Sequence, residues 1–463
     1  MRCELCRYST SSGGGWRSSQ AWGRLASFAL AGAIAVGAAA VPAAPAMAAT
    51  DHRPVTITFW NWWDGERATF MKTVIEHFHE QYPWITVDSK VQGWTGVQAK
   101  IMSAFAAGVA PEVMMAPRNQ ILALADMGAI IPLTKYIQRD KVDLSMFYPA
   151  EVDAFRYAGQ QWTLPLPTVT ANDDFYFYNK DAFDQAGLDP NHPPETWTSF
   201  EEVGLKLNRR DGSGKYTQLF VNPGPHMYLD FLFSNGGYPV SSDLRHEAIS
   251  SLRSKEALNY LYELGAKVAG PQAGPFMASN PNAFLKGKLV TLFENVSLVR
   301  SLVDMAAQGQ PLNWSVGLIP YNEKNPDARS TGVAARGFGW GYVIPKGLPP
   351  EKEEAAWLWI KFLTTDKYGT GYFSFMMGRP SPVKYWNQNP DYRKVNPAFD
   401  RILAAMETDR ALPAIPVVGD ITDAIVNNLW GVAAGTASPV DAGNNIAKQV
   451  QNILDKYWAK AGR

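Results

Sequence analysis

Residues 160–180, which read QQWTLPLPTVTANDDFYFYNK, decide the fold. The stretch begins as a short apolar run that two prolines interrupt, turns polar at residues 172–174, and becomes aromatic at residues 175–178. Proline is tolerated at the ends and edges of sheets, whereas an unbroken aromatic run is typical of a strand covered on both faces. The stretch therefore predicts two strands joined by an extended linker that passes from one sheet to another. We expect one lobe before it, a second lobe after it, and a small-molecule cleft between them.

The sequence before this stretch alternates between strand and helix patterns. Residues 55–59 alternate apolar and polar side chains as a half-buried strand does, and an apolar stripe at helical spacing follows in residues 70–82. Residues 85–87 and 111–115 predict two further strands with a helix between them. This alternation predicts an α/β lobe with a mostly parallel sheet, in which ligands bind beyond the carboxyl ends of the strands.

Tryptophans gather at these predicted strand ends. Trp60, Trp62 and Trp63 precede Asp64 directly, and Trp94 lies at the next strand end. Neighbouring residues cannot both face one way, so both a core position and a site position stay open for Trp62 and Trp63, and Trp60 can face either. Pyranose rings present apolar C–H faces that pack on aromatic planes, while carboxylates, amides and arginine bind their hydroxyls. The pattern favours a sugar site.

The first 48 residues predict a secretory signal. They contain a basic start, an alanine-rich apolar stretch over residues 25–41, and Ala46-Met47-Ala48, so we expect cleavage after Ala48. A membrane anchor is the alternative, but the apolar run falls short of the about 18 strongly apolar residues that a span needs. Both cysteines, Cys3 and Cys6, lie inside this segment, so the mature chain has no thiol nucleophile and no cysteine at the cleavage point. These features favour a soluble protein of a periplasm.

The composition is that of an ordinary globular protein. The chain has 463 residues, enough for two or three domains, with 46% hydrophobic and 19% charged residues. Its formal net charge of zero gives no basic footprint for nucleic acid. Aromatic residues reach 12% and include 16 tryptophans, which is high and matters if the ligand is a sugar.

A motif in residues 164–197 carries a family resemblance. It reads Leu164-Pro165, then YNKD at 178–181, AGL at 186–188 and PPETW at 193–197. The motif resembles the central crossing segment of the solute-binding proteins of ABC sugar importers, of the maltose and multiple-sugar-binding type. Further matches follow in order over nearly all of residues 55–457, and it is the ordered set that makes the resemblance strong.

The resemblance implies a two-lobe periplasmic-binding-protein fold of the α/β class, each lobe a mostly parallel sheet flanked by helices. It implies three hinge crossings, near residues 171–174, 287–288 and 339–341, whose polar or glycine-rich sequence lets the backbone rotate. The expected domains are residues 1–48 as signal peptide, 49–172 with 289–340 as lobe 1, and 173–288 with 341–463 as lobe 2.

The resemblance also implies further ligand-contacting positions. Arg118 stands where relatives often carry Asp or Trp, so it either indicates an acidic sugar or bridges hydroxyls. His226 has the alternative of a loop histidine without a role, and Glu294 that of an edge charge. The complete set of predicted ligand-binding residues is Trp60, Trp62, Trp63, Asp64, Trp94, Arg118, Asn119, Asp173, His226, Tyr228, Asp230, Glu294, Trp340 and Arg379.

No catalytic motif competes with a binding role. A glycosidase needs two carboxylates at a defined separation, and the adjacent pair Asp173-Asp174 has side chains that diverge. The pair His77 and His79 faces apart on a helix, which speaks against a metal site. We expect a monomeric receptor without cofactor, metal or catalysis that delivers a sugar or oligosaccharide to the permease subunits of an ABC importer. The alternatives are a receptor for a polyamine or peptide, or a secreted glycan-active enzyme.

Overall fold

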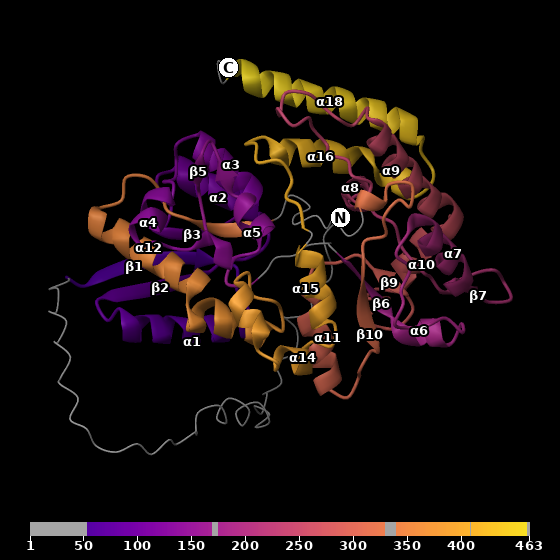
Figure 1. The fold of residues 1–463 in the computed structure, drawn as a ribbon, viewed down its shortest axis with the longest axis horizontal. Coiled ribbons are helices and arrows are strands. Elements are labelled where there is room, and N and C mark those ends of the chain that lie inside the picture. Colours follow the sequence, from indigo (N-terminus) through magenta and orange to yellow (C-terminus); the bar gives the residue numbers. More distant parts are fainter. Residues whose placement is uncertain (1–52, 169–174, 329–338, 408, 461–463) are drawn as a thin grey trace. The chain divides into compact units, whose positions relative to one another are not determined.

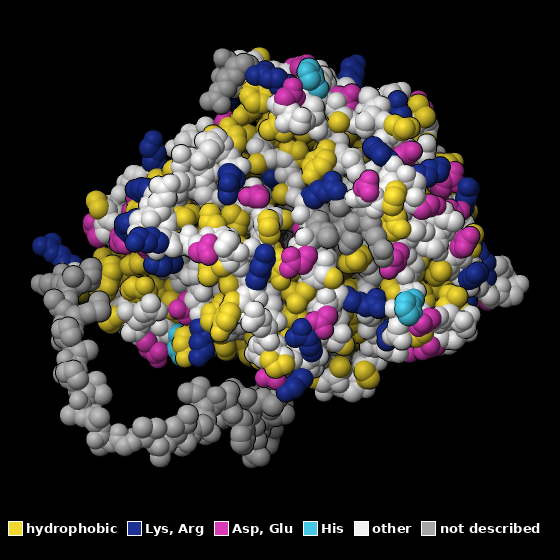
Figure 2. Space-filling model, viewed as in Figure 1, with side chains coloured by type: hydrophobic (Ala, Val, Ile, Leu, Met, Phe, Trp, Pro, Cys, Tyr) yellow, Lys and Arg dark blue, Asp and Glu magenta, His cyan; other side chains and the backbone are white. Residues whose placement is uncertain are grey.

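The computed structural model describes residues 53–168, 175–328, 339–407 and 409–460, and a compact unit begins at Val55 (Figure 1). The predicted signal at residues 1–48, the predicted crossing at residues 171–174 and Asp173 lie outside the described residues. Among the helices that are described, none combines the length and apolar character needed to cross a membrane. Basic and acidic side chains are intermixed over the face shown in Figure 2.

The first sheet has the strand order β11-β3-β1-β2, formed by β1 (Val55–Asn61), β2 (Ile85–Val91), β3 (Val113–Pro117) and β11 (Trp340–Val343). β1 runs parallel to β2 and β3, because helices α1 (Glu66–Gln81) and α2 (Val97–Ala106) return the chain between successive strands. β11 is antiparallel to β3. The prediction of a mostly parallel first sheet with alternating helices is therefore confirmed.

Helices cover the first sheet and complete its core. α12 (Pro350–Thr365) lies against β1, and α1 packs on β2 and α12 (Figure 1). Phe59 of β1 meets Trp359 of α12 edge to face at 5.5 Å between ring centroids, and Phe78 of α1 meets the same indole at 4.9 Å. All three rings are fully buried. The segment after β11 is thus an integral part of the first core.

The second sheet has the order β10-β6-β9, formed by β6 (Phe175–Asn179), β9 (Thr291–Leu292) and β10 (Trp314–Leu318). Every residue of β6 is buried, as the aromatic run predicts. Both neighbours of β6 are antiparallel to it, so the expectation of a mostly parallel second sheet is wrong. The antiparallel register places Gly317 opposite Tyr176, whose ring approaches within 2.5 Å of where a Cβ would lie.

The predicted domain boundaries also need correction after residue 288. β9 and β10 pair with β6, so residues 289–318 belong with the second sheet and not with the first. Lys288 does not mark a crossing. Its carbonyl accepts a hydrogen bond from the backbone amide of Leu219, which also lies next to the second sheet. The chain returns to the first core through β11, and α12, Phe373 and Val383 remain in it. It rejoins the second sheet's core from Ala398 onward, because α15 packs on β10.

The remaining elements connect and cover these two sheets. In chain order they are α3 (Arg118–Asp126), α4 (Thr134–Arg139), η2 (Leu144–Met146), α5 (Pro149–Asp153), β4 (Arg156–Tyr157), β5 (Gln160–Gln161), α6 (Lys180–Asp184), α7 (Trp197–Leu207), β7 (Arg209–Arg210), β8 (Tyr216–Gln218), α8 (Met227–Phe233), α9 (Leu252–Glu263), η3 (Leu264–Ala269), α10 (Ala273–Ser279), α11 (Leu298–Ala307), η4 (Pro326–Ala328), η5 (Lys367–Gly371), α13 (Tyr372–Met377), η6 (Lys384–Gln388), α14 (Tyr392–Val395), α15 (Phe399–Glu407), α16 (Val418–Asn428), α17 (Trp430–Ala433) and α18 (Pro439–Lys460).

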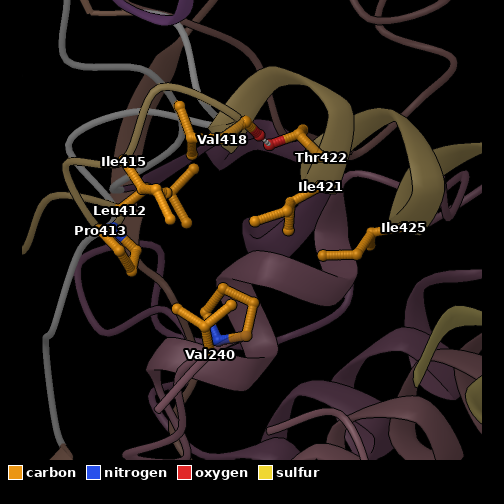
Figure 3. A pocket seen from close by; sticks show the side chains of 9 residues that line it. Val240, Leu412, Pro413, Ile415, Val418, Ile421, Thr422 and Ile425 are labelled. Carbon is orange, nitrogen blue, oxygen red and sulfur yellow. Dashed lines mark hydrogen bonds between the residues drawn. The ribbon is translucent and has the colours of Figure 1, made fainter. Parts of the chain in front are cut away.

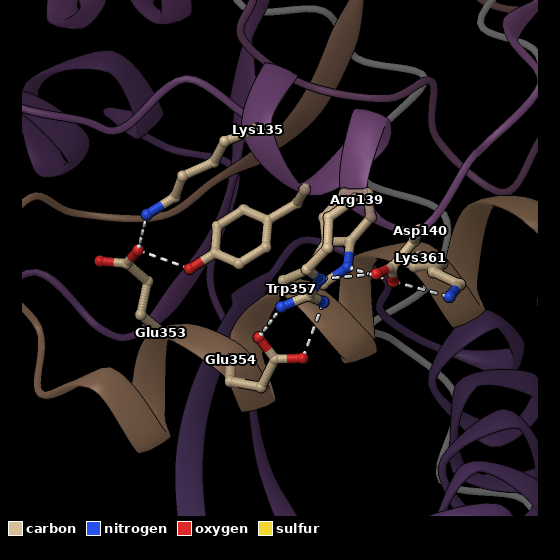
Figure 4. Close-up of polar contacts among 8 residues, drawn as sticks. Lys135, Arg139, Asp140, Glu353, Glu354, Trp357 and Lys361 are labelled. Carbon is tan, nitrogen blue, oxygen red and sulfur yellow. Dashed lines mark hydrogen bonds and ion pairs between the residues drawn. The ribbon is translucent and has the colours of Figure 1, made fainter.

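A polar network fastens α12 to the end of α4 (Figure 4). Asp140 accepts hydrogen bonds from Arg139 Nε at 2.7 Å, Lys361 Nζ at 2.8 Å and Trp357 Nε1 at 2.9 Å. Burial alone would raise the pKa of Asp140, but these bonds outweigh it and hold the pKa well below its usual range. Since α12 covers β1, this carboxylate helps to fix the sheet that carries the site.

We predict that Asp140→Asn lowers the free energy of unfolding at pH 7 by about 1.5–3 kcal/mol, because three charge-assisted or buried bonds lose their ionised acceptor. A depressed pKa stabilises the folded state above the pKa of the unfolded chain, so the deficit shrinks as the pH falls below about 4. Urea unfolding at pH 7 and pH 3 measures both effects.

Asp400→Asn is the matched control, because Asp400 is 65% exposed in its pair with Arg393. Its loss stays below about 1 kcal/mol at either pH. An Asp140→Asn deficit that is absent at pH 7, or equal at both pH values, contradicts the role given to this network.

Candidate functional site

One edge of the first sheet collects the residues predicted from the strand ends. Asn61, the last residue of β1, pairs with Val91, the last of β2, and Trp340 at the start of β11 pairs with Pro117 at the end of β3. The turns that follow β1, β2 and β3 therefore lie at the same edge of the sheet as Trp340, the first residue of the antiparallel strand β11. Ligands of α/β sheets bind at this carboxyl edge.

Three tryptophans form a contiguous cluster at this edge, which we call the tryptophan tip: Trp62, Trp94 and Trp340. The Trp340 ring lies 5.9 Å from that of Trp62, in a tilted arrangement, and 5.7 Å from that of Trp94, edge to face. Trp62 is fully buried, Trp340 is partly exposed, and Trp94 is 37% exposed. The cluster thus grades from core to surface, and only its outer members offer a ring to a solute.

Trp62 and Trp63 take the core alternative. The Trp62 indole donates to the Gly93 carbonyl at 3.2 Å, which ties the turn after β2 to the end of β1. Trp63 is buried against Phe373 at 5.1 Å between centroids, and its indole donates to the Tyr342 hydroxyl at 3.4 Å. Both rings are packed inside the protein in this structure, and ligand contact by Trp62 or Trp63 stays a prediction.

Trp60 and Asp64 flank these two buried rings. Trp60 lies inside β1 and is partly buried against the first core. Asp64 accepts from the Trp94 indole at 3.2 Å through Oδ2 and pairs with the Arg67 guanidinium through Oδ1. Arg67 lies 5.7 Å from the Trp94 ring centroid. Sequence reasoning missed Arg67, although its position three residues after Asp64, at the start of a helix, is a usable signal.

A second group of elements meets the tip from the side of the second sheet. α11 packs its Leu298, Val299 and Leu302 into the core around β6 and β10. Arg300 of the same helix binds Glu66 of α1 at 2.7 Å and donates to the Met376 carbonyl of α13 at 3.1 Å. The start of α1, the start of α11 and the end of α13 therefore converge next to the tryptophan tip.

Arg379 follows α13 at this convergence. Its neighbour Gly378 adopts a left-handed conformation with φ 64°, and a Cβ there would lie 3.5 Å from Val299 of α11. The Arg379 side chain is 5% exposed, and its Nε has no hydrogen-bond partner among the described residues. Burial, with a smaller contribution from nearby Arg67, lowers the pKa of Arg379 to about 9.

Arg118 behaves differently from Arg379, although both are buried. Its Nε and one terminal nitrogen donate to the carbonyls of Ala154 and Leu412, while Nη1 lacks a partner among the described residues. Burial lowers the pKa of Arg118 to about 9. With no exposed surface, Arg118 ties α3 to the segment before α16. That Arg118 contacts ligand stays a prediction.

Two further predicted residues, Asn119 and Glu294, lie in different parts of the structure. Asn119 packs against α16, because a Cβ on Gly419 would lie 2.9 Å from its amide nitrogen. Glu294 follows β9, at the edge of the second sheet where β6 begins, and its Oε1 accepts from the Asn295 amide at 2.9 Å. Glu294 is half-buried and precedes α11, which places it on the convergence side of that sheet.

The predicted residues around α8 belong to the second core. Tyr228 is fully buried, burial raises its pKa, and its hydroxyl shares a 2.6 Å hydrogen bond with Ser254. Asp230 is also fully buried within α8, and His226 is half-buried just before it. The whole of α8 is packed inside, and ligand contact by Tyr228 and Asp230 stays a prediction.

An apolar depression elsewhere is not a rival site (Figure 3). Its walls come from the segment before α16, from α16 and from Val240, and aliphatic side chains and prolines dominate them. The hydroxyl of Thr422, its one polar side chain, already donates to the Val418 carbonyl at 2.9 Å. A polar solute would find no partner there. Among the described residues, no cluster of His, Cys, Asp or Glu could hold a metal.

Comparison with known proteins identifies the family. The family model described as "Bacterial extracellular solute-binding protein" matches residues 73–399, well over half of the chain. The sn-glycerol-3-phosphate-binding periplasmic protein UgpB of Escherichia coli strain K12 is 22% identical over 466 residues, covering 92% of this chain and 97% of that protein. UgpB of Pectobacterium atrosepticum is 29% identical over 178 residues, covering 38% of this chain and 39% of that protein.

Solved structures of sugar-binding proteins share the fold. The structure of the sugar-binding protein MalE from Xanthomonas citri matches with a TM-score of 0.75 at 21% identity, covering 88% of this chain and 100% of that one. The α/β periplasmic-binding-protein fold predicted from the sequence is thereby confirmed. The matched family consists of binding proteins and not of enzymes, as the absence of a catalytic motif predicts.

The difference in burial between Trp62 and Trp94 predicts two different mutant phenotypes. Trp62→Ala lowers the free energy of unfolding by about 3–5 kcal/mol, because it opens a cavity in the core and frees the turn after β2. Trp94→Ala costs less than about 1 kcal/mol, since an exposed ring leaves no cavity. Chemical unfolding of both variants measures the difference. Equal losses would show that the tip is not graded from core to surface.

Proposed function

Because the chain belongs to the bacterial extracellular solute-binding proteins, we propose that it is the receptor of an ABC importer for a sugar or oligosaccharide. In this role it binds the solute in the periplasm, closes on it and hands it to the permease subunits in the membrane. The proposal gives the protein no catalytic step.

The observation that carries the proposal is the exposed side of the tryptophan tip. Trp94 and Trp340 lie edge to face at 5.7 Å and keep accessible surface, while Asp64 and Arg67 stand beside them with hydrogen-bonding groups. Aromatic faces next to a carboxylate and a guanidinium suit a ring that is apolar on its faces and polar at its rim. Trp94 and Trp340 are the proposed platforms, and Asp64 and Glu294 the proposed acceptors for hydroxyl groups.

The proposed closure turns on connections between the two sheet systems. One that the structure describes lies between Val383 and Ala398. A few connecting residues can absorb the rotation of one sheet system against the other. Closure would bring Glu294 and the α11 side toward the tryptophan tip, so the solute would be held from both sides.

A second candidate solute is glycerol 3-phosphate, which the name of the curated relatives supports. This solute is smaller than a pyranose, covers less aromatic surface, and depends more on charge for its affinity. The two candidates therefore differ in which residues should dominate binding.

Titration calorimetry on the mature protein tests the proposal. A thermal-shift screen of mono- and oligosaccharides and of glycerol 3-phosphate first selects the solute, because a ligand of the folded state raises its stability. We expect a sugar to give the largest shift, and Trp94→Ala or Trp340→Ala to weaken its binding by at least about 2 kcal/mol, roughly thirtyfold.

Trp430→Ala is the matched control, since Trp430 is 58% exposed on α17 and far along the chain from the tip. It should bind like the wild type. Unchanged affinity in both tip variants would remove the tryptophan platform from the proposal. A larger shift with glycerol 3-phosphate than with any sugar would favour the second candidate.

A further inference from the structure

Arg67, Arg300 and Arg379 lie around the convergence of α1, α11 and α13, and they differ in one respect. Arg67 pairs with Asp64, and Arg300 pairs with both Glu66 and Asp304. The side chain of Arg379 has no hydrogen bond and no ion pair with any residue that the structure describes. Two of the three positive charges are thus balanced by the protein, and one is not.

The surroundings of Arg379 make this imbalance costly. The side chain is 5% exposed, and the charged neighbour that affects its pKa is another arginine, Arg67, among the described residues. A buried charge without a counter-ion is unfavourable, because water is removed and nothing replaces it. An oxyanion placed between the two guanidinium groups would supply the missing partner.

The backbone holds Arg379 in a fixed position. Its amide donates to the Ser374 carbonyl at 3.1 Å, and the Asn396 side chain donates to the Gly378 carbonyl at 2.9 Å. Two residues on, the Ser381 amide donates to Asn387 Oδ1 at 2.8 Å. The guanidinium therefore projects from an anchored loop rather than from a surface tail, as a specific binding group does.

We propose that the solute carries an oxyanion, a carboxylate or a phosphate, that binds Arg379 next to the tryptophan tip. The planar guanidinium matches both groups with two parallel hydrogen bonds. Arg67 reaches the same region, since its guanidinium lies 5.7 Å from the Trp94 ring centroid. The sugar ring then packs on Trp94 and Trp340 while its charged substituent faces Arg379. This inference rests on the proposed function and narrows it to an acidic or phosphorylated sugar.

Matched pairs of neutral and charged sugars test the inference on the mature chain. Calorimetry compares glucose with glucuronate and with glucose 6-phosphate, and galactose with galacturonate. We expect at least one charged sugar to bind about tenfold or more tightly than its neutral partner, as a charge-assisted pair requires. The carboxylate and phosphate arms show which oxyanion the site takes.

Arg379→Gln should abolish that preference, and Arg379→Lys should keep part of it. Without solute, Arg379→Gln should melt no lower than the wild type, because the charge it removes has no partner. Arg393→Gln is the control, since Arg393 is 45% exposed in its pair with Asp400, and it should keep the full preference.

The outcomes separate this inference from the proposed function. If neutral sugars bind as tightly as charged ones in the wild type, or if Arg379→Gln keeps the preference, the oxyanion site is overturned and the sugar receptor stands. If no sugar of either kind raises the melting temperature, the sugar receptor and its narrowing to a charged sugar both fail. Should Arg379→Gln not fold, the ratio of charged to neutral affinity in the wild type decides alone.

Discussion

The burial of Trp62 where β1 ends is the interaction on which the candidate site depends. Its ring is enclosed, its indole holds the Gly93 carbonyl, and its outer side supports Trp340. Trp340 in turn supports Trp94, the most exposed ring of the tip. A chain of packed aromatic side chains thus leads from the core to the surface, and the packing fixes the outer rings without hydrogen bonds between them.

Electrostatics add a second constraint at the same place. The convergence of α1, α11 and α13 joins the two sheet systems through Arg300, which binds Glu66 and the Met376 carbonyl. Ion pairs of this kind, partly exposed, contribute little stability by themselves. They do set the direction in which neighbouring elements face, and they leave Arg379 as the positive charge that the described protein does not neutralise.

The sequence predicted the parts of the fold that depend on local pattern. Alternating side chains gave β1, and the aromatic run gave the fully buried β6. The sequence did not show that the strands of the second sheet run antiparallel, because β9 has two residues and pairs with a strand far away along the chain. For the same reason it placed residues 289–318 in the wrong lobe.

The same distinction between local pattern and distant contacts applies to the predicted site residues. Pattern alone located the ends of β1 and β2 and therefore Asp64 and Trp94, whereas Trp340 came from the family resemblance. Burial of the others depends on distant partners: Arg118 on the Leu412 carbonyl, and Tyr228 on Ser254. A single sequence does not show which polar side chain will meet such a partner.

Fluorine NMR of the protein labelled with 5-fluorotryptophan shows directly whether a bound sugar contacts the tryptophan tip, with each resonance assigned by a Trp→Phe variant. On saturation with the sugar that stabilises the protein most, we expect the Trp94 and Trp340 resonances to shift. Those of Trp357, a buried residue of α12, and of exposed Trp430 should stay in place. Shifts confined to tryptophans away from the tip, with Trp94 and Trp340 unchanged, would show that the sugar binds elsewhere.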